Sequence, residues 1–192
     1  MRPVNFVVFL VVLLGVADVA QAQPASPRGD AATQIGETWI TVNYGRPILR
    51  GRTNIFGAGD SYGQTVNAGA PVWRAGANKS TRFKTVADLQ FGDHTLPAGE
   101  YSVFVDLKEN DWTLIVSNHA AKDNFRDAGD GLWGAYNYTD DKDVFRISMS
   151  VEQTSTSYDQ FTIAFVNVTD SGGTLAMMWE NTMATCPFSL AQ

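Results

Sequence analysis

The chain has 192 residues, a formal net charge of −6 and a single cysteine, Cys186. Its basic residues are scattered along an acidic chain, which argues against nucleic acid as a partner, because nucleic-acid-binding domains gather Lys and Arg into basic patches. A single cysteine also excludes an internal disulfide, so a hydrophobic core has to hold the fold together. We expect Cys186 to be a buried, inert thiol, since no neighbouring charge would lower its pKa.

Residues 1–22 have the pattern of a secretory signal peptide. Arg2 gives the positive start, an apolar run extends from Phe6 to Val16, and Ala20-Gln21-Ala22 is a small-x-small cleavage site. The apolar run is shorter than the roughly 20 residues of a membrane-spanning helix, and no later segment is apolar enough to cross a bilayer. We therefore expect a mature chain that begins at Gln23, has no membrane span, and works in the periplasm or outside the cell.

After cleavage roughly 170 residues remain, which suits one domain. Residues 23–30 contain Pro and Ser and predict a flexible lead-in to a single domain over residues 31–192. Apolar and polar residues alternate with period two, and no window has a sustained helical period, so the pattern predicts strands joined by turns. The predicted strands cover residues 38–44, 82–91, 100–105, 112–116, 143–151, 160–166, 174–179 and 182–188. This succession predicts an all-β, antiparallel β-sandwich, with a jelly-roll-like or barrel-like arrangement as the alternative.

Two long segments without a strand pattern, residues 45–81 and 118–143, interrupt the strands. Long irregular segments in a compact domain are usually either functional or disordered. Both segments are rich in aromatic residues, which disordered segments lack. We therefore expect two long ordered loops that pack over the sheet.

A series of short motifs follows one another along nearly the whole mature chain. They include Tyr44-Gly45-Arg46-Pro47, Arg50-Gly51-Arg52, Ile55-Phe56-Gly57, Val72-Trp73-Arg74-Ala75-Gly76-Ala77-Asn78, Leu96-Pro97-Ala98-Gly99-Glu100-Tyr101-Ser102, Trp133-Gly134 and Trp179-Glu180. In this order they resemble an exported bacterial family catalogued as domain of unknown function 2911. The resemblance implies an exported β-sandwich module and assigns no catalytic or binding residue. Residues 58–71 form a longer link between the third and fourth motifs than the family usually has.

The strongest candidates for ligand binding gather around one segment of the first long loop. Trp73, Arg74 and Asn78 place an aromatic ring, a guanidinium and a carboxamide close together, and Arg46 and Trp133 are further candidates. A guanidinium can hold a carboxylate or a phosphate by two parallel hydrogen bonds, and a loop tryptophan can stack on a sugar ring. Of this segment, we expect Trp73 to contact the ligand.

The same residues also fit a purely structural role. The chain has an arginine group, and one of its members, Arg74 or Arg146, would pair with Asp143 or Glu180 to tie the loops to the sandwich, because a buried charge needs a partner. Trp73 and Trp133 would then cover the open end of the sandwich. The tryptophans of the predicted strands are expected in the core: Trp39, Trp112 and Trp179. The full arginine group is Arg46, Arg50, Arg52, Arg74 and Arg146.

Patterns for catalysis or metal binding are sparse. His94 and His119 lack zinc-ligand spacing, and the chain has no Gly-x-Ser-x-Gly motif. The second loop is acidic, and its oxygens could suit Ca²⁺, but their spacing does not match the EF-hand pattern. The acidic residues of this loop are Asp123, Asp127, Asp130, Asp140, Asp141 and Asp143. We expect no metal, no cofactor and no catalytic residue.

The sequence therefore favours a non-catalytic binding or interaction module of the cell envelope, whose partner is a small polar ligand or a glycan. One alternative is a hydrolase that uses the loop carboxylates or His94. The other alternative is a purely structural envelope protein. The sequence does not indicate the oligomeric state.

Overall fold

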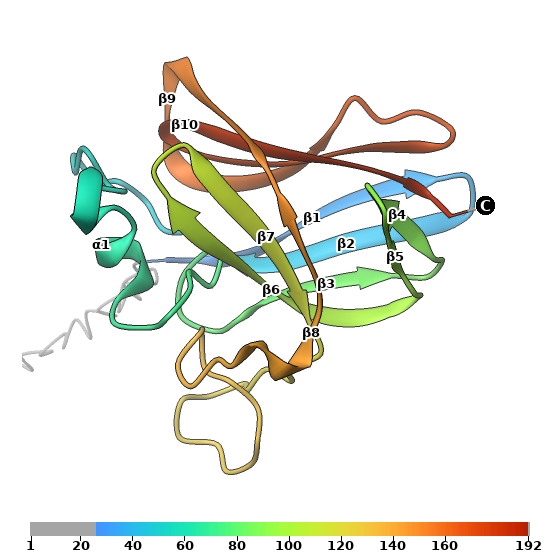
Figure 1. The fold of residues 1–192 in the computed structure, drawn as a ribbon, viewed down its shortest axis with the longest axis horizontal. Coiled ribbons are helices and arrows are strands. Elements are labelled where there is room, and N and C mark those ends of the chain that lie inside the picture. Colours follow the sequence, from blue (N-terminus) through green and yellow to red (C-terminus); the bar gives the residue numbers. More distant parts are fainter. Residues whose placement is uncertain (1–25, 192) are drawn as a thin grey trace, which may run out of the picture.

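The computed structural model describes residues 26–191, so the predicted signal peptide lies outside the described residues. Two antiparallel sheets pack face to face as a sandwich and do not close into a barrel (Figure 1). This confirms the predicted all-β sandwich and excludes the barrel-like alternative. The helices within the described residues are short, and none is both long and apolar enough to span a bilayer.

The larger sheet has the strand order β1-β2-β3-β6-β7-β8, and the smaller sheet has the order β5-β4-β10-β9. The strands of the larger sheet are β1 (Arg28–Ile35), β2 (Thr38–Gly45), β3 (Thr81–Thr85), β6 (Gly99–Lys108), β7 (Asp111–Ser117) and β8 (Asp143–Ser148). Those of the smaller sheet are β4 (Leu89–Phe91), β5 (His94–Leu96), β9 (Ser150–Val166) and β10 (Gly172–Leu190). The long loops contain the short helix α1 (Gln64–Asn67) and the single turns η1 (Gly59–Ser61) and η2 (Asp140–Lys142).

The alternation of β2 decides which of its side chains enter the core. Ile40 and Val42 are buried, so the pleat turns Trp39 to the opposite face, where it is 50% exposed. The prediction that Trp39 belongs to the core is therefore wrong. Trp112 and Trp179 are 1% and 4% exposed, as predicted.

In the first half of the chain, two segments of the structure differ from the predicted strands. β1 begins at Arg28, inside the segment expected as a lead-in, and the Arg28 guanidinium donates hydrogen bonds to the carbonyls of Asn43 (3.0 Å) and Ser80 (2.8 Å). The predicted strand over residues 82–91 is two strands, β3 and β4, which belong to different sheets. The chain therefore crosses between the layers in this stretch.

β10 is one long strand where the sequence predicts two. Its pairing with β9 shifts register on both sides of Glu180, which has a left-handed backbone (φ 53°). Such a bulge re-aims the neighbouring side chains. Trp179 is buried in the core, and the Glu180 carboxylate accepts hydrogen bonds from the backbone N–H groups of Asn54 (2.5 Å) and Ile55 (2.9 Å). The bulge thus fastens the first long loop to the smaller sheet.

The core between the sheets is centred on a cluster of five aromatic rings. Each ring of the cluster contacts at least two others, at centroid distances between 4.8 and 6.3 Å. The rings belong to Phe56, Trp73, Trp112, Phe161 and Trp179. Cys186 lies in the same core with no exposed surface, and burial raises the pKa of its thiol to about 11. Burial of Cys186 is as predicted.

Parts of the two long loops cover the outer face of the larger sheet at β6 and β7. Phe104 of β6 and Ile115 of β7 point away from the sandwich core and are fully buried by residues of both loops. The loop residues in this second cluster are Ala70, Val72, Leu132, Ala135 and Tyr138. β6 and β7 are consequently buried on both faces, and the expectation of ordered loops packed over the sheet is confirmed.

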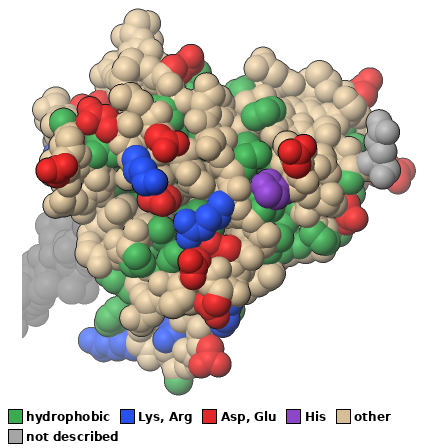
Figure 2. Space-filling model, viewed as in Figure 1, with side chains coloured by type: hydrophobic (Ala, Val, Ile, Leu, Met, Phe, Trp, Pro, Cys, Tyr) green, Lys and Arg blue, Asp and Glu red, His purple; other side chains and the backbone are tan. Residues whose placement is uncertain are grey.

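On the face in view in Figure 2, acidic side chains are spread widely, and basic side chains lie next to some of them. The net charge of −6 is therefore not gathered into one acidic patch on the side shown.

Candidate functional site

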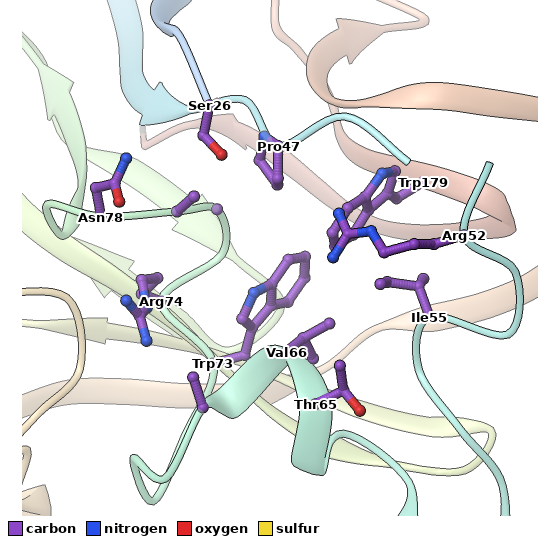
Figure 3. A pocket seen from close by; sticks show the side chains of 13 residues that line it. Ser26, Pro47, Arg52, Ile55, Thr65, Val66, Trp73, Arg74, Asn78 and Trp179 are labelled. Atoms are coloured by element: carbon purple, nitrogen blue, oxygen red, sulfur yellow. The ribbon is translucent and has the colours of Figure 1, made fainter. Parts of the chain in front are cut away.

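A pocket of about 230 Å³ opens beside the first long loop (Figure 3). Arg74 and Asn78 lie on one side, Arg52 points in from the opposite side, and Trp73 and Trp179 form its inner wall. α1 closes it below through Val66 and Thr65. We call this concavity the Arg74 pocket.

A contact between two backbones holds the loop on which Arg74 lies. Gly76 and Gly45 approach so closely that a Cβ on Gly76 would lie 2.6 Å from the Gly45 carbonyl oxygen. Ala75, between Arg74 and Gly76, has a left-handed backbone (φ 45°), and its carbonyl accepts a hydrogen bond from the Thr81 hydroxyl (2.7 Å). The small residues thus allow this turn to pack against the end of β2, and the hydrogen bond from Thr81 fixes the backbone next to Arg74.

The Arg74 guanidinium is held in a narrow slot between the two long loops. It lies over the Tyr136 ring at 5.1 Å from the ring centroid. A Cβ on Gly134, which has φ 65°, would lie 3.0 Å from its central carbon. Its Nη2 donates one long hydrogen bond, of 3.4 Å, to the carbonyl of Asn67. The plane of the guanidinium is therefore fixed by packing more than by hydrogen bonds.

Arg74 is 8% exposed, yet the ion pairs among residues 26–191 do not include it. A buried charge without a counter-ion is costly, and breaking a buried pair commonly destabilises a protein by about 3–5 kcal/mol. The predicted pairing of Arg74 with Asp143 or Glu180 is absent from the described structure. Arg74 is thus a buried guanidinium that faces a pocket.

Arg146, and not Arg74, has the structural role that the sequence predicts for one of these two arginines. Its Nε donates to Asp143 (2.8 Å) and its Nη2 to the Tyr138 hydroxyl (2.7 Å), which in turn donates to Asp143 (2.6 Å). Burial and the hydrogen bond to the Asp143 carboxylate raise the pKa of Tyr138 well above its usual range. The predicted network that ties the second loop to the sandwich is therefore confirmed for Arg146.

Arg52 reaches the pocket from a different part of the first loop. Its Nε and Nη2 donate to the carbonyls of Leu49 (3.0 Å) and Ile48 (2.9 Å), and its guanidinium lies over the Trp179 ring at 5.9 Å. These contacts anchor an otherwise exposed side chain and direct it across the mouth of the pocket (Figure 3).

The two tryptophans of the inner wall, Trp73 and Trp179, differ in how their rings are packed and hydrogen-bonded. Trp73 is 1% exposed and is stacked parallel to Trp179, with other aromatic rings at its edges, so it offers no open face for a ligand to stack on. Trp179 Nε1 is buried and has no hydrogen-bond partner among the described residues. A buried donor without an acceptor is rare in folded proteins.

Two of the predicted ligand-binding residues lie outside the Arg74 pocket. Arg46 packs on Gly29 of β1, with its Nε buried and unpaired within the described part of the chain. Trp133 lies in the second loop against the exposed Phe125, with ring centroids 6.5 Å apart. The structure therefore brings Trp73, Arg74 and Asn78 together and leaves Arg46 and Trp133 aside.

The end of the Val72–Thr81 segment locks the loops together. The Ser80 hydroxyl contacts the carbonyls of Gly134 (2.6 Å) and Leu132 (3.2 Å), and Lys79 pairs with Asp123. Both contacts join the first long loop to the second. One short segment thus combines a pocket wall with a structural clasp.

The hydrolase alternative uses His94 or the acidic residues of the second loop. His94 is exposed, with its ring stacked on Phe145 at 5.1 Å. Of the loop carboxylates, Asp123 pairs with Lys79 and Asp143 pairs with Arg146. No group of three or more His, Cys, Asp or Glu side chains within residues 26–191 is arranged to hold a metal ion. A second concavity of about 370 Å³ contains Glu109 and Glu180, and both carboxylates accept hydrogen bonds from backbone N–H groups.

Arg52 and Trp179 line the pocket but are not among the ligand-binding residues that the sequence predicts. The sequence places Arg52 in the arginine group and predicts Trp179 in the core. Both lie in the short motifs of the resemblance, which was the available signal. Nothing in the local sequence shows that they face Arg74, because Arg52 comes from another part of an irregular loop and Trp179 from a strand about 100 residues further along the chain.

Comparison with known proteins agrees with the order of these motifs. The model of the family described as "Protein of unknown function (DUF2911)" matches residues 26–188. No curated protein and no solved structure gives a significant match. Because the match covers most of the chain and all of the sandwich strands except the last two residues of β10, the chain belongs to the DUF2911 family.

Proposed function

We propose that this protein is a non-catalytic binding module that holds a small polar ligand in the Arg74 pocket. The observation that carries the proposal is the Arg74 guanidinium, which is 8% exposed, lines a pocket and has no carboxylate partner within the described residues. A ligand with a hydrogen-bond acceptor would supply the missing partner.

The composition of the pocket wall supports binding without catalysis. Its polar side chains are those of Arg52, Arg74 and Asn78, with the hydroxyls of Ser26 and Thr65. The lining contains no Asp, Glu, His, Cys, Lys or Tyr, the side chains that most often serve as general acids and bases. Fixed donors beside aromatic walls are the usual composition of a small-ligand pocket.

The proposed place of action is the periplasm or the outside of the cell. This part of the proposal rests on the signal-peptide pattern of residues 1–22, with its small-x-small cleavage site at Ala20-Gln21-Ala22. A sugar or a short glycan belongs to the range of ligands to be tested.

The test is a thermal-shift screen of sugars, organic acids, phosphates and Ca²⁺ on protein purified after expression of the full chain. The screen uses wild type, Arg74→Gln and Arg126→Gln, the last being an exposed arginine on the second loop. At a concentration of 100 times its Kd, a ligand stabilises the folded protein by about 2.7 kcal/mol. We expect at least one compound to raise the Tm of wild type and Arg126→Gln and to leave Arg74→Gln unchanged. A screen in which no compound protects wild type, or in which Arg74→Gln is protected equally, would contradict the proposal.

A further inference from the structure

We propose that the ligand of the Arg74 pocket carries an oxyanion, a carboxylate or a phosphate, which binds between Arg74 and Arg52. This inference rests on the proposed function and names the chemical class of its ligand. It follows from the charge of the pocket, from the hydrogen-bonding character of its side chains and from the way the two arginines are held.

The lining of the pocket is positively charged in an acidic protein. Two guanidiniums, those of Arg52 and Arg74, reach the pocket, and its lining contains no carboxylate, although the chain has a net charge of −6. Elsewhere in residues 26–191, Arg82 and Arg146 pair with carboxylates at 3.0 and 2.8 Å. The pocket is thus a place where two arginines share a concavity without an internal anion.

The guanidiniums of the pocket are donors only. A guanidinium has five N–H groups and no acceptor, and Arg74 uses one N–H for the long bond to Asn67. The other polar side chains of the lining both donate and accept: those of Ser26, Thr65 and Asn78. A sugar hydroxyl brings a donor along with its acceptor lone pairs, whereas an ionised carboxylate or phosphate offers mainly acceptors. The two guanidiniums therefore favour an oxyanion over a neutral sugar.

The guanidiniums are held in place before a ligand arrives. The Arg74 guanidinium lies in the slot between Gly134 and the Tyr136 ring, and two carbonyls and the Trp179 ring hold Arg52. Figure 3 shows the two side chains entering from opposite sides, with the Trp73 ring between them. A planar fork that is already oriented loses little freedom when it binds a carboxylate or phosphate, and this geometry favours bidentate contacts.

The test compares matched charged and neutral probes by isothermal titration calorimetry. One pair is glucose 6-phosphate and glucose, and the other is succinate and succinamide, so that the two arms distinguish phosphate from carboxylate. Each probe is titrated into wild type, Arg74→Gln, Arg52→Gln and the control Arg126→Gln. We expect at least one charged probe to bind wild type and the control at least tenfold more tightly than its neutral counterpart. Arg74→Gln should weaken that binding tenfold or more, and Arg52→Gln should weaken it to a smaller degree.

The results separate this inference from the proposed function. A charged probe and its neutral counterpart could bind with equal affinity, and both could bind Arg74→Gln more weakly. That result overturns the inference of an oxyanion ligand and still supports the proposed binding function. Failure of both charged probes, while a neutral compound of the thermal-shift screen protects wild type and not Arg74→Gln, has the same meaning. Failure of all four probes and of the whole screen overturns both. If a charged probe binds Arg74→Gln and wild type equally tightly, its binding site lies outside the pocket. That result also overturns the inference.

Discussion

Arg74 and Arg146 are the same residue type in two opposite electrostatic settings. Arg146 is partly exposed and pairs with Asp143, whose side chain is only 9% exposed. Arg74 is buried over Tyr136 and has no carboxylate partner in the described residues. Removal of each charge should therefore change stability in different directions, which distinguishes a binding residue from a structural one.

We expect Arg74→Met to leave the Tm of the ligand-free protein unchanged or to raise it, because the substitution keeps the apolar stem and removes an uncompensated buried charge. Arg146→Met is the matched comparison. It should lower stability by about 1–3 kcal/mol, since it leaves the buried Asp143 carboxylate without its cation. For a domain of this size each kcal/mol corresponds to roughly 2–4 °C. Thermal unfolding followed by circular dichroism measures both. A loss in Arg74→Met as large as in Arg146→Met would show that Arg74 is a structural tie.

Cys186 should make stability fall at alkaline pH. The unfolded thiol ionises near pH 9.0, whereas burial raises the pKa in the folded protein to about 11. The folded state therefore retains its proton after the unfolded state has lost it, and the free energy of unfolding decreases as pH rises from about 9 to about 11. The loss should approach 2–3 kcal/mol, because each pH unit between the two pKa values contributes about 1.4 kcal/mol.

Urea unfolding at pH 8.5 and pH 11 measures this loss. Buried tyrosines such as Tyr138, whose pKa is also raised, add to the alkaline loss, so Cys186→Ala serves as the reference. The drop in Cys186→Ala should be smaller than in wild type. Equal drops in the two proteins would show that the thiol does not contribute.

At the scale of elements, the second long loop supports the pocket that the first long loop forms. Gly134 lies against the Arg74 guanidinium and the Asn78 carbonyl, and Tyr136 faces the guanidinium. The Ser80 hydroxyl contacts the carbonyl of Gly134 (2.6 Å). The orientation of Arg74 thus depends on a loop that is about 60 residues away in the sequence.

We expect Gly134→Ala to destabilise the protein more than Gly36→Ala. Both glycines have a left-handed backbone, with φ 65° and 58°, so both substitutions carry a backbone cost of about 1–2 kcal/mol. A Cβ at Gly134 would also lie 3.0 Å from Arg74 and from the Asn78 carbonyl, whereas a Cβ at Gly36 meets nothing within 4 Å. Urea unfolding gives the difference, and the charged probe that binds wild type should lose affinity only in Gly134→Ala. Equal effects of the two substitutions would mean that the contact with Arg74 is unimportant.

Several elements could be predicted from the sequence, and others could not. β2, β6 and β7 have clear alternation or apolar runs between turn residues, and β6 and β7 pair as antiparallel neighbours. β1 was missed because its alternating residues, Ala31 and Thr33 before Ile35, are small or polar and give a weak signal. β10 was divided at Glu180 because a bulge breaks the period of two without ending the strand.

At the scale of the whole molecule, non-covalent contacts hold two sheets and two long loops together. β4 and β10 pair across about 100 residues of sequence, and the loops share a hydrophobic cluster with β6 and β7. Because the loops are built into this second cluster, we expect them to unfold together with the sandwich.

The folded protein should therefore unfold in a single transition that is insensitive to reducing agent, since the chain has one cysteine and cannot form an internal disulfide. Tryptophan fluorescence reports on the aromatic core, and far-ultraviolet circular dichroism reports on the strands. Their urea midpoints should coincide, with and without dithiothreitol. An early fluorescence transition that leaves the circular dichroism unchanged would show that the loop-covered core opens separately.

The sequence by itself determined the class of the fold, the residues of most strands, the buried thiol and the order of the family motifs. These features depend on local periodicity and composition. Successive side chains of a strand point to opposite faces of the sheet, so an alternating sequence indicates a strand directly. The tertiary structure alone decided that Trp39 is exposed, that Arg146 rather than Arg74 pairs with Asp143, and that Arg52 faces Arg74 across a pocket. The physical reason is that the environment of a charge depends on surfaces brought together from distant segments, and local sequence carries no record of that approach.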